Sequence, residues 1–494
     1  MGLSESVTAK GGREIRVERA LPEGWLAPLV VAGIVRALML VPSIGQDFQG
    51  DESAYLALSE AWAQFGAYAG QWPPLQTAFL ALFESVFSPH GEAAARVALS
   101  VVSLWSGAWL MALALRVHSE NAARITGWIW ALYLPLLPFS HVLLSEGLTI
   151  ALLLPALTLL LATAQGELTA GRATLGILGA GVFLGLGCLT RESGLFWLAT
   201  LGAWSLFGLR TGRPLALRRA ALLIGAALVT IAPWSFTASR SLGSFQLLGR
   251  TAGVNAYMGW NANYVNFDLV GLDVPTEGVP GAALRAGLLA TPDGVEQWSY
   301  EFIPDLGERN QVHVANGAAF VRAHPGFFLR TRAVKAADLA TPLSFMTRFL
   351  RMPPGDPEAR GLAHSGGYGP PLSGTIIRLI LAVLAVLSVL AVGALGALGA
   401  TVVTLRKGAA SMFLAGLVAT APLALVVAMS RFRAPLEAFA LVAVAAALAS
   451  LGRDGSALRR GRGPWAACAG LLLVLCGTWY LSVPAVVAMF RSLL

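Results

Sequence analysis

Charged residues are scarce in this chain of 494 residues, since Asp, Glu, Lys and Arg together make up 13% of it while 56% is hydrophobic. An ordinary soluble domain carries about 25% charged residues. Apolar runs of about 20 residues, long enough to cross roughly 30 Å of hydrocarbon, recur along most of the sequence. The composition therefore excludes an ordinary soluble domain and predicts a membrane protein.

Patterns that bind metals or nucleotides are also missing. The three cysteines, Cys188, Cys468 and Cys476, fall inside apolar runs without CxxC spacing, so we expect packing residues and no disulfide or metal ligand. The six histidines are scattered without ligand spacing, and no Gly-rich phosphate loop is present. No cleavable signal peptide is evident, because the first apolar run has the length of a membrane span and lacks a small-residue cleavage site.

The apolar runs predict an all-α polytopic membrane protein with about eleven transmembrane helices. The predicted spans are residues 24–44, 95–115, 123–140, 142–164, 173–190, 194–209, 219–237, 374–404, 411–430, 435–452 and 464–483. The net charge of +8 comes from basic clusters before the first span, between the sixth and seventh, after the eighth and before the last. The positive-inside rule places these clusters on the cytoplasmic face, so the basicity reflects topology and nucleic acid is not an expected partner.

Two long segments then face the outer side of the membrane. The first, residues 46–92, contains no Lys or Arg, and its apolar residues recur at helical spacing, which predicts a helix in the membrane interface. The second, residues 238–373, is rich in Gly, Pro and Asn and has one helical pattern from residue 314 to 349. The chain therefore divides into a cytoplasmic tail (1–23), spans one to seven with the first outer loop (24–237), a large outward segment (238–373) and spans eight to eleven (374–494).

Ionisable side chains gather at the outer ends of the spans, where a charge is costly unless it faces a cavity or another charge. Carboxylates can act as general bases, while arginines suit phosphate oxygens. Carboxylates and arginines together at the edge of the lipid favour a lipid-linked phosphate as substrate. The stretches "GVNAYMGWNANY" and "QWPP" offer aromatic faces and amide groups that suit a sugar. The outer charges are Asp51, Glu52, Glu146, Arg191, Glu192, Arg240, Arg431 and Arg433.

Simpler interpretations of the same residues remain open. The acid pair could be a solvated loop that enforces topology, and Glu146 could serve only the helix dipole. Arg431 and Arg433 could be interfacial anchors, although outward arginines oppose the positive-inside bias. Arg36 lies in the middle of the first span, where we expect it to face the bundle and an acidic partner.

Four stretches resemble motifs of the type C glycosyltransferases, in particular the bacterial relatives of dolichyl-phosphate-mannose protein mannosyltransferases and of the lipid A aminoarabinose transferase. "DESAYLALSEAWAQFG" resembles the acidic first-loop motif, and "LLSEGLTIALLL" the second acidic position. "PWSFTASRSLGSFQLLGRTAGVNAYMGWNANY" is similar to the pattern after span seven, and "RFRAPLEAFALVAVAAAL" to the Arg-aromatic-Arg-x-Pro motif of a late helix. The resemblance covers roughly residues 25–450.

The resemblance implies roles for individual residues. Asp51 would be the catalytic base, with Glu52 as its neighbour and Glu146 as the second acid. Relatives usually carry Arg or Lys before the Pro-Pro of the first loop, where this chain has Gln71 and Trp72, so another arginine supplies that charge or the acceptor differs. The implied substrate-binding residues are Tyr55, Arg96, Arg191, Arg240, Asn255, Tyr257, Asn261, Arg431 and Arg433, and a divalent cation stays open because some relatives use one.

The resulting expectation is an inverting glycosyltransferase of the plasma (inner) membrane that works on the periplasmic or extracellular side. It would move a hexosyl or pentosyl group from a polyprenyl-phosphate donor to a glycan, lipid or protein acceptor. A transporter or flippase of a lipid-linked glycan is the alternative. Such a protein should have pseudo-symmetric halves and charges deep inside the spans, whereas this chain gathers its charges at one surface and has one large outward segment. An inactive scaffold of the same fold is a third hypothesis, which the missing basic residue at Gln71 and Trp72 keeps open.

Overall fold

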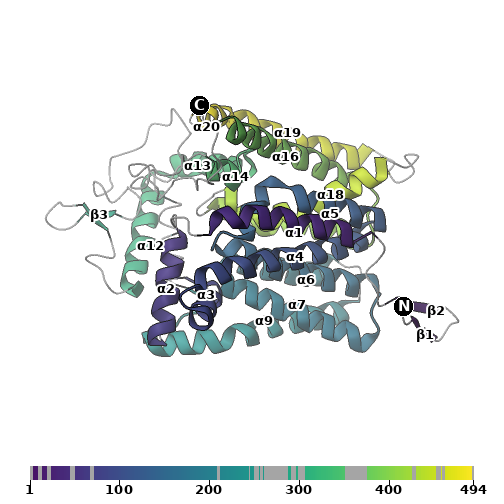
Figure 1. Cartoon of the computed structure of the whole chain (residues 1–494), viewed down its shortest axis with the longest axis horizontal. Helices are drawn as coiled ribbons and strands as arrows, with labels where there is room; N and C mark the ends of the chain where they lie inside the picture. The colour runs from purple at the N-terminus through teal and green to yellow at the C-terminus, as the bar shows by residue number, and fades with distance from the viewer. Residues whose placement is uncertain are drawn as a thin grey trace.

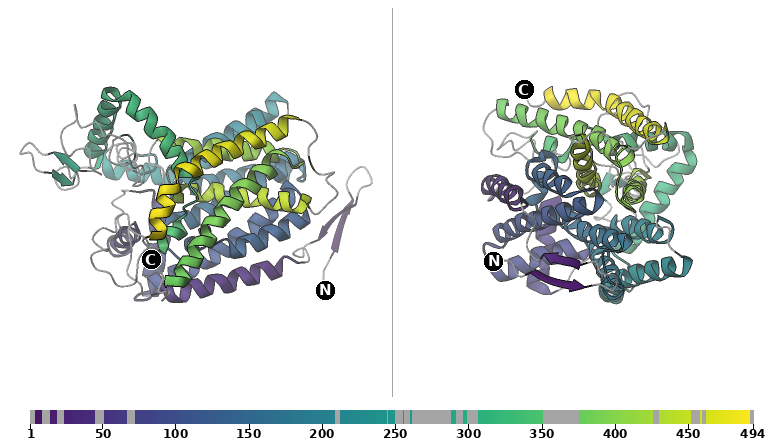
Figure 2. Two further views of the ribbon diagram at one scale, coloured as in Figure 1. Left: turned by 90° about the horizontal axis from the view of Figure 1, so that it is seen from above. Right: turned by 90° about the vertical axis from the view of Figure 1, so that its right-hand side faces the viewer.

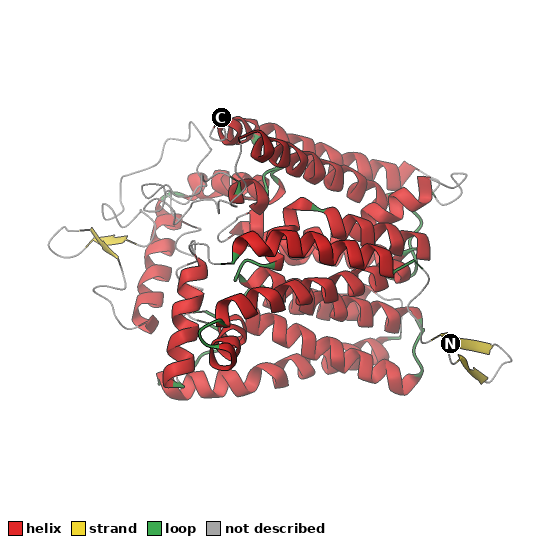
Figure 3. Ribbon diagram, viewed as in Figure 1, coloured by secondary structure: helices red, strands yellow, loops and turns green. Residues whose placement is uncertain are grey.

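The apolar runs fold into helices that lie side by side, which are shown in a computed structural model (Figure 1 and Figure 3). The structure describes residues 24–44, 51–66, 72–208, 212–243, 245–249, 306–350, 375–425, 430–451 and 462–491, with the short pieces 4–8, 14–18, 288–290 and 296–298 and the single residues 255, 260 and 458. Its strands form two antiparallel hairpins, β1 (Ser4–Thr8) with β2 (Glu14–Glu18) and β3 (Leu288–Ala290) with β4 (Glu296–Trp298). Everything else in the described architecture is helical or loop.

Among the described residues, seven helices are long and apolar enough to cross a membrane. They are α4 (Gly91–Val117), α6 (Ser145–Gln165), α7 (Ala170–Thr190), α9 (Arg213–Leu242), α16 (Thr375–Thr401), α18 (Ala434–Leu451) and α19 (Arg462–Leu481). Shorter apolar helices are α1 (Leu26–Leu40), α3 (Pro74–Phe87), α8 (Gly194–Ala203), which continues as a π-turn, and α17 (Ala409–Thr420), which continues as the 3-10 helix η6 (Ala421–Leu425). The predicted helical, multi-pass membrane fold is confirmed.

Two predicted helices are interrupted at prolines. The span predicted at 123–140 ends as α5 (Glu120–Leu132) and continues as the 3-10 helix η2 (Leu134–Ser140), which contains Pro135 and Pro138. The helix predicted at 314–349 consists of α12 (Leu306–Ala323), α13 (Pro325–Ala340) and α14 (Phe345–Phe349), with Pro325 and Pro342 at the breaks. Proline lacks the N–H of the helical hydrogen bond and disfavours a helical residue before it, so each prediction was too long.

Helix α6 lies at the centre of the bundle, since 83% of its most apolar window is buried. It packs between α4 and α7, and α7 packs against α9. Gly185 permits this approach, because a Cβ there would lie 2.8 Å from the Ala227 carbonyl oxygen. Helix α19 is the opposite case, with 6% of its window buried, and packs along α16 at the edge of the bundle (Figure 2).

The bundle has two chemically different ends. Helix α2 (Asp51–Phe65) crosses one end together with α12, while the β1–β2 hairpin lies at the other (Figure 1). At the hairpin end, the Gln165 amide donates to the Arg116 and Lys407 carbonyls, and the Arg406 N–H donates to Val117. One of the basic clusters, Arg406 and Lys407, therefore lies against the ends of α4 and α6.

Arg36 lies inside the bundle as predicted, but its neighbours differ from those expected. Its guanidinium donates to the Ser103 hydroxyl at 2.7 Å and to the carbonyls of Ala32 and Trp130 at 3.1 and 3.2 Å. It also lies over the Trp130 ring, 5.2 Å from the centroid. Within the described residues its contacts are a hydroxyl, two carbonyls and a ring face, so the predicted acidic partner is not among them.

Candidate active site

Four charged side chains from four segments meet at the α2 end of the bundle. Asp51 begins α2, Glu146 lies in the first turn of α6, Arg191 follows α7, and Arg431 lies in the 3-10 helix η7 (Ser430–Arg433). Arg431 Nη2 donates to Asp51 Oδ2 at 2.5 Å, and its Nε lies 3.6 Å from Glu146 Oε1. Arg191 Nη1 lies 2.6 Å from the same Glu146 oxygen. The structure therefore joins both predicted acids through one predicted arginine.

Exposure increases across this cluster. The Glu146 side chain is 2% exposed, Arg431 17% and Asp51 41%. Glu146 and Asp51 both occupy the first turns of their helices, where the helix dipole favours negative charge. A buried carboxylate with two arginine partners holds their guanidinium groups in place, whereas Asp51 stays accessible from outside.

An aromatic ring that the sequence analysis did not select completes the cluster. Phe432 lies between the two arginines, with its ring centroid 4.8 Å from the Arg191 guanidinium carbon and 5.4 Å from that of Arg431. A ring face attracts such cations. The only sequence signal for it was the aromatic position between Arg431 and Arg433.

Tyr55 lies one helical turn after Asp51 and is buried. Its hydroxyl interacts with the Ser145 side chain, which also accepts a hydrogen bond of 2.9 Å from Arg191. Its ring contacts Trp72 at a centroid distance of 4.5 Å. Burial raises the pKa of the Tyr55 phenol, so the hydroxyl stays neutral at ordinary pH and acts as a hydrogen-bonding group beside the acids.

Glu52 has a different environment from Asp51, because adjacent helix residues point about 100° apart. Its carboxylate is buried, lies 3.1 Å from Arg96 Nη1, and accepts the Leu143 N–H at 2.8 Å. Arg96 also donates to the His141 carbonyl at 2.9 Å. Glu52 and Arg96, predicted as catalytic and substrate-binding residues, thus hold the segment that leads into Glu146.

The remaining predicted residues have other surroundings or lie outside the described residues. Arg433 donates to the backbone carbonyls of Leu339, Thr341 and Leu343. Arg240 lies in the last turn of α9 and is exposed, and Asn255 is a half-buried single residue. Gln71, Tyr257 and Asn261 lie outside the described residues.

The cluster does not fit a divalent cation well. Within the described part of the chain, no three His, Cys, Asp or Glu side chains group as metal ligands. Asp51 and Glu146 both face Arg431, whose positive charge would oppose a second cation between them. The chemistry proposed below therefore uses side chains alone.

The chain is similar to type C glycosyltransferases of known structure. No family model matches its sequence, and no curated protein sequence does. The archaeal oligosaccharyltransferase AglB from Archaeoglobus fulgidus, solved with an inhibitory peptide and a dolichol-phosphate, is 15% identical with a TM-score of 0.44. The match covers 94% of this chain and 56% of AglB, so the chain spans little more than half of that protein.

Two further solved structures show the same level of similarity. ArnT from Cupriavidus metallidurans, bound to undecaprenyl phosphate, is 17% identical with a TM-score of 0.39, over 87% of this chain and 79% of ArnT. The S. cerevisiae protein O-mannosyltransferase Pmt1-Pmt2 complex, bound to the sugar donor, is 16% identical with a TM-score of 0.39, over 52% of this chain and 40% of that one. These proteins belong to the group that the four motifs resemble, and the function has to be inferred from this chain's own residues.

Proposed function

We propose that the protein is an inverting glycosyltransferase that moves a sugar from a polyprenyl-phosphate donor to an acceptor hydroxyl at the outer face of the membrane. The carrying observation is the convergence of an accessible carboxylate, Asp51, and a buried one, Glu146, on Arg431 at one end of a membrane bundle. A base for a hydroxyl and a cation for a phosphate are the two groups that this reaction needs.

In the proposed reaction, Asp51 accepts the proton of the acceptor hydroxyl while the hydroxyl oxygen attacks the anomeric carbon. The bond between that carbon and the phosphate oxygen breaks, and its electron pair leaves with the phosphate. Attack opposite the leaving group inverts the configuration. The products are the glycosylated acceptor, the polyprenyl phosphate and a protonated Asp51, which then returns its proton to water.

Arg431 would stabilise the charge that develops on the leaving phosphate. Its position suits this role, because its Nε lies 3.6 Å from the Glu146 carboxylate, its guanidinium carbon lies 5.4 Å from the Phe432 ring centroid, and its Nη2 donates to Asp51. A phosphate at Arg431 would take over the donor that Asp51 uses in the free protein, which would release Asp51 to act as a base. Arg240 is a further proposed phosphate contact at the end of α9.

Charge and the arrangement of the bundle support a site on the outer side. The cluster lies at the α2 end, opposite the β1–β2 hairpin of the tail that carries basic residues (Figure 1). The positive-inside rule assigns the hairpin end to the cytoplasm. A plasma-membrane enzyme with a periplasmic or extracellular site is therefore proposed, acting on a glycan, lipid or protein acceptor.

The test is sugar transfer in membranes that contain the protein, supplied with radiolabelled polyprenyl-phosphate hexoses and pentoses. Asp51→Asn keeps the size of the side chain but cannot accept the proton, and we expect transfer to fall by about 10²- to 10⁴-fold. Glu60→Gln, on the exposed side of α2, is the matched control and should keep full activity. Full-rate transfer by Asp51→Asn would exclude this residue as the base, and no transfer by the wild type with any donor would refute the function.

A further inference from the structure

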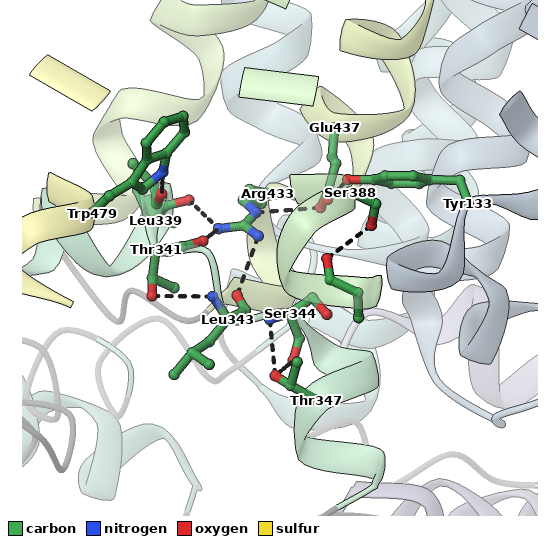
Figure 4. Close-up of polar contacts among 12 residues, drawn as sticks. Tyr133, Leu339, Thr341, Leu343, Ser344, Thr347, Ser388, Arg433, Glu437 and Trp479 are labelled. Atoms are coloured by element: carbon green, nitrogen blue, oxygen red, sulfur yellow. Dashed lines mark hydrogen bonds and ion pairs between the residues drawn. The ribbon is translucent and has the colours of Figure 1, made fainter. Parts of the chain in front are cut away.

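At the end of α13 the outward segment is bonded to the bundle by one arginine, Arg433, which donates to three carbonyls of the segment (Figure 4). Arg433 Nη1 donates to the carbonyls of Leu339 at 3.0 Å and Thr341 at 2.5 Å, and Nη2 donates to Leu343 at 3.2 Å. The last carbonyls of a helix have no partner within the helix and carry its negative dipole end. The buried Arg433 guanidinium donates hydrogen bonds to these carbonyls and also places a positive charge at the negative end of the helix dipole.

The charge of Arg433 is balanced by a carboxylate one turn later. Arg433 Nε donates to Glu437 Oε2 at 3.3 Å, and the other Glu437 oxygen accepts a short hydrogen bond from the Tyr133 hydroxyl. Tyr133 lies between α5 and η2, so the network joins α18, the α5–η2 junction and the outward segment. Four of the five N–H groups of the guanidinium thereby have partners, and a phosphate would have to break several of these bonds to bind there.

The attached segment also supports the opposite side of the charge cluster. After Thr341, Pro342 ends the helix and the chain turns into α14, whose Phe345 and Met346 are buried in the core. The Phe345 ring stacks on Phe139 of η2 with centroids 4.9 Å apart. Helix η2 leads directly into the loop before Glu146. Residues 339–346 therefore contact η7 through Arg433 and the start of the Glu146 segment through Phe139.

We propose that Arg433 is a positioning residue, which holds Arg431 against Asp51 and Glu146 by fixing η7 to the end of α13. The proposal rests on the proposed function for the role of Arg431, but it assigns Arg433 no contact with substrate. Arg431 and Arg433 lie in the same four-residue 3-10 helix, so a shift of one moves the other. An outward segment that loosens would therefore displace the phosphate-binding arginine.

The chain provides a matched control at the same helix end. Trp479 of α19 donates its indole N–H to the Ala340 carbonyl at 3.0 Å (Figure 4). Trp479→Phe removes one bond to the end of α13 without touching η7. Arg433→Lys keeps the positive charge but replaces the planar, multidentate guanidinium with a single compact ammonium.

The decisive experiment is a double-mutant cycle measured as kcat and donor KM. We expect Arg433→Lys to lower kcat/KM by about 10- to 100-fold, the range for a small displacement of a reacting group, while Trp479→Phe changes it by less than about twofold. In an Arg431→Lys background, Arg433→Lys should have almost no further effect, because residues that act through one another are not additive. Equal losses in both backgrounds, or an equal loss from Trp479→Phe, would overturn the proposal.

Hydrogen exchange supplies a readout that does not depend on activity. Arg433→Lys should raise amide exchange in residues 341–350 and also in peptides covering 430–437, whereas Trp479→Phe should affect at most the first region. Exchange that stays unchanged at 430–437 in Arg433→Lys would also overturn the proposal. A wild type that neither transfers sugar nor gains thermal stability from added undecaprenyl phosphate would instead refute the proposed function, with the exchange result still deciding the positioning role.

Discussion

Replacing Glu52 with glutamine tests whether this acid anchors the site or takes part in the reaction. The Glu52 and Arg96 side chains are each 3% exposed and lie 3.1 Å apart. At an effective dielectric constant of about 20, unit charges at that separation interact by about 5 kcal/mol. The free energy of unfolding should fall by less than this Coulomb energy. Removing one partner of a buried pair costs about 3–5 kcal/mol, and after the change Arg96 still has the Glu92 carboxylate at 2.7 Å.

We therefore expect Glu52→Gln to destabilise the protein by about 2–4 kcal/mol, which is the lower part of the range for a broken buried pair because one carboxylate partner remains. The glutamine oxygen can still accept the Leu143 N–H, so the change isolates the charge. Glu92→Gln is the matched control, because Glu92 contacts the same arginine but its side chain is 26% exposed. Because the Glu92 carboxylate is partly solvated, its loss should cost less than that of Glu52, about 1 kcal/mol.

The measurement is unfolding of both variants in the same detergent, followed by tryptophan fluorescence during a denaturant titration. Glu52→Gln should unfold at a clearly lower denaturant concentration than Glu92→Gln. The Glu52→Gln variant should also transfer less sugar than the wild type, since Glu52 and Arg96 hold the chain before Glu146. If Glu92→Gln destabilises as much as Glu52→Gln, the buried pair does not anchor this end of α2.

Two other changes test the site and the packing. Phe432→Leu keeps an apolar side chain but removes the ring between Arg191 and Arg431, and a loss of about 1 kcal/mol should lower kcat/KM about fivefold; unchanged kinetics would show that the ring face does not hold these groups. Gly185→Val should lower the yield of folded protein in detergent, because the added atoms overlap α9 and overpacking costs about 1–3 kcal/mol, while Gly187→Ala, whose Cβ would meet nothing within 4 Å, should fold normally. A normal yield for Gly185→Val would contradict the tight α7–α9 contact.

The bundle was predictable because membrane thickness sets the length of an apolar helix. Helices α4, α6, α7 and α18 begin and end within a few residues of the predicted spans. The errors arose where the hydrophobic pattern continued through a proline, at Pro135 and Pro325. In both places the apolar residues continue in the sequence while the proline lacks the N–H of a helical hydrogen bond, so hydropathy alone could not show the break.

The charge cluster was predictable in part, because side-of-membrane reasoning brings Asp51, Glu146 and Arg431 to one end of the bundle. It could not separate Arg431 from Arg433, which have the same charge and lie two residues apart. What separates them is a set of backbone carbonyls about 90 positions earlier in the chain. Every residue has a carbonyl, so such partners leave no mark in the sequence.

The exposure difference between Asp51 and Glu146 also determines which reagents can reach each acid. With 41% of its side chain exposed, Asp51 is open at the protein surface, while Glu146 at 2% is not. A water-soluble carboxylate reagent would therefore modify Asp51 first. In the proposed enzyme the acceptor hydroxyl would therefore reach the exposed Asp51 directly, whereas Glu146 would act only through the two arginines that it contacts.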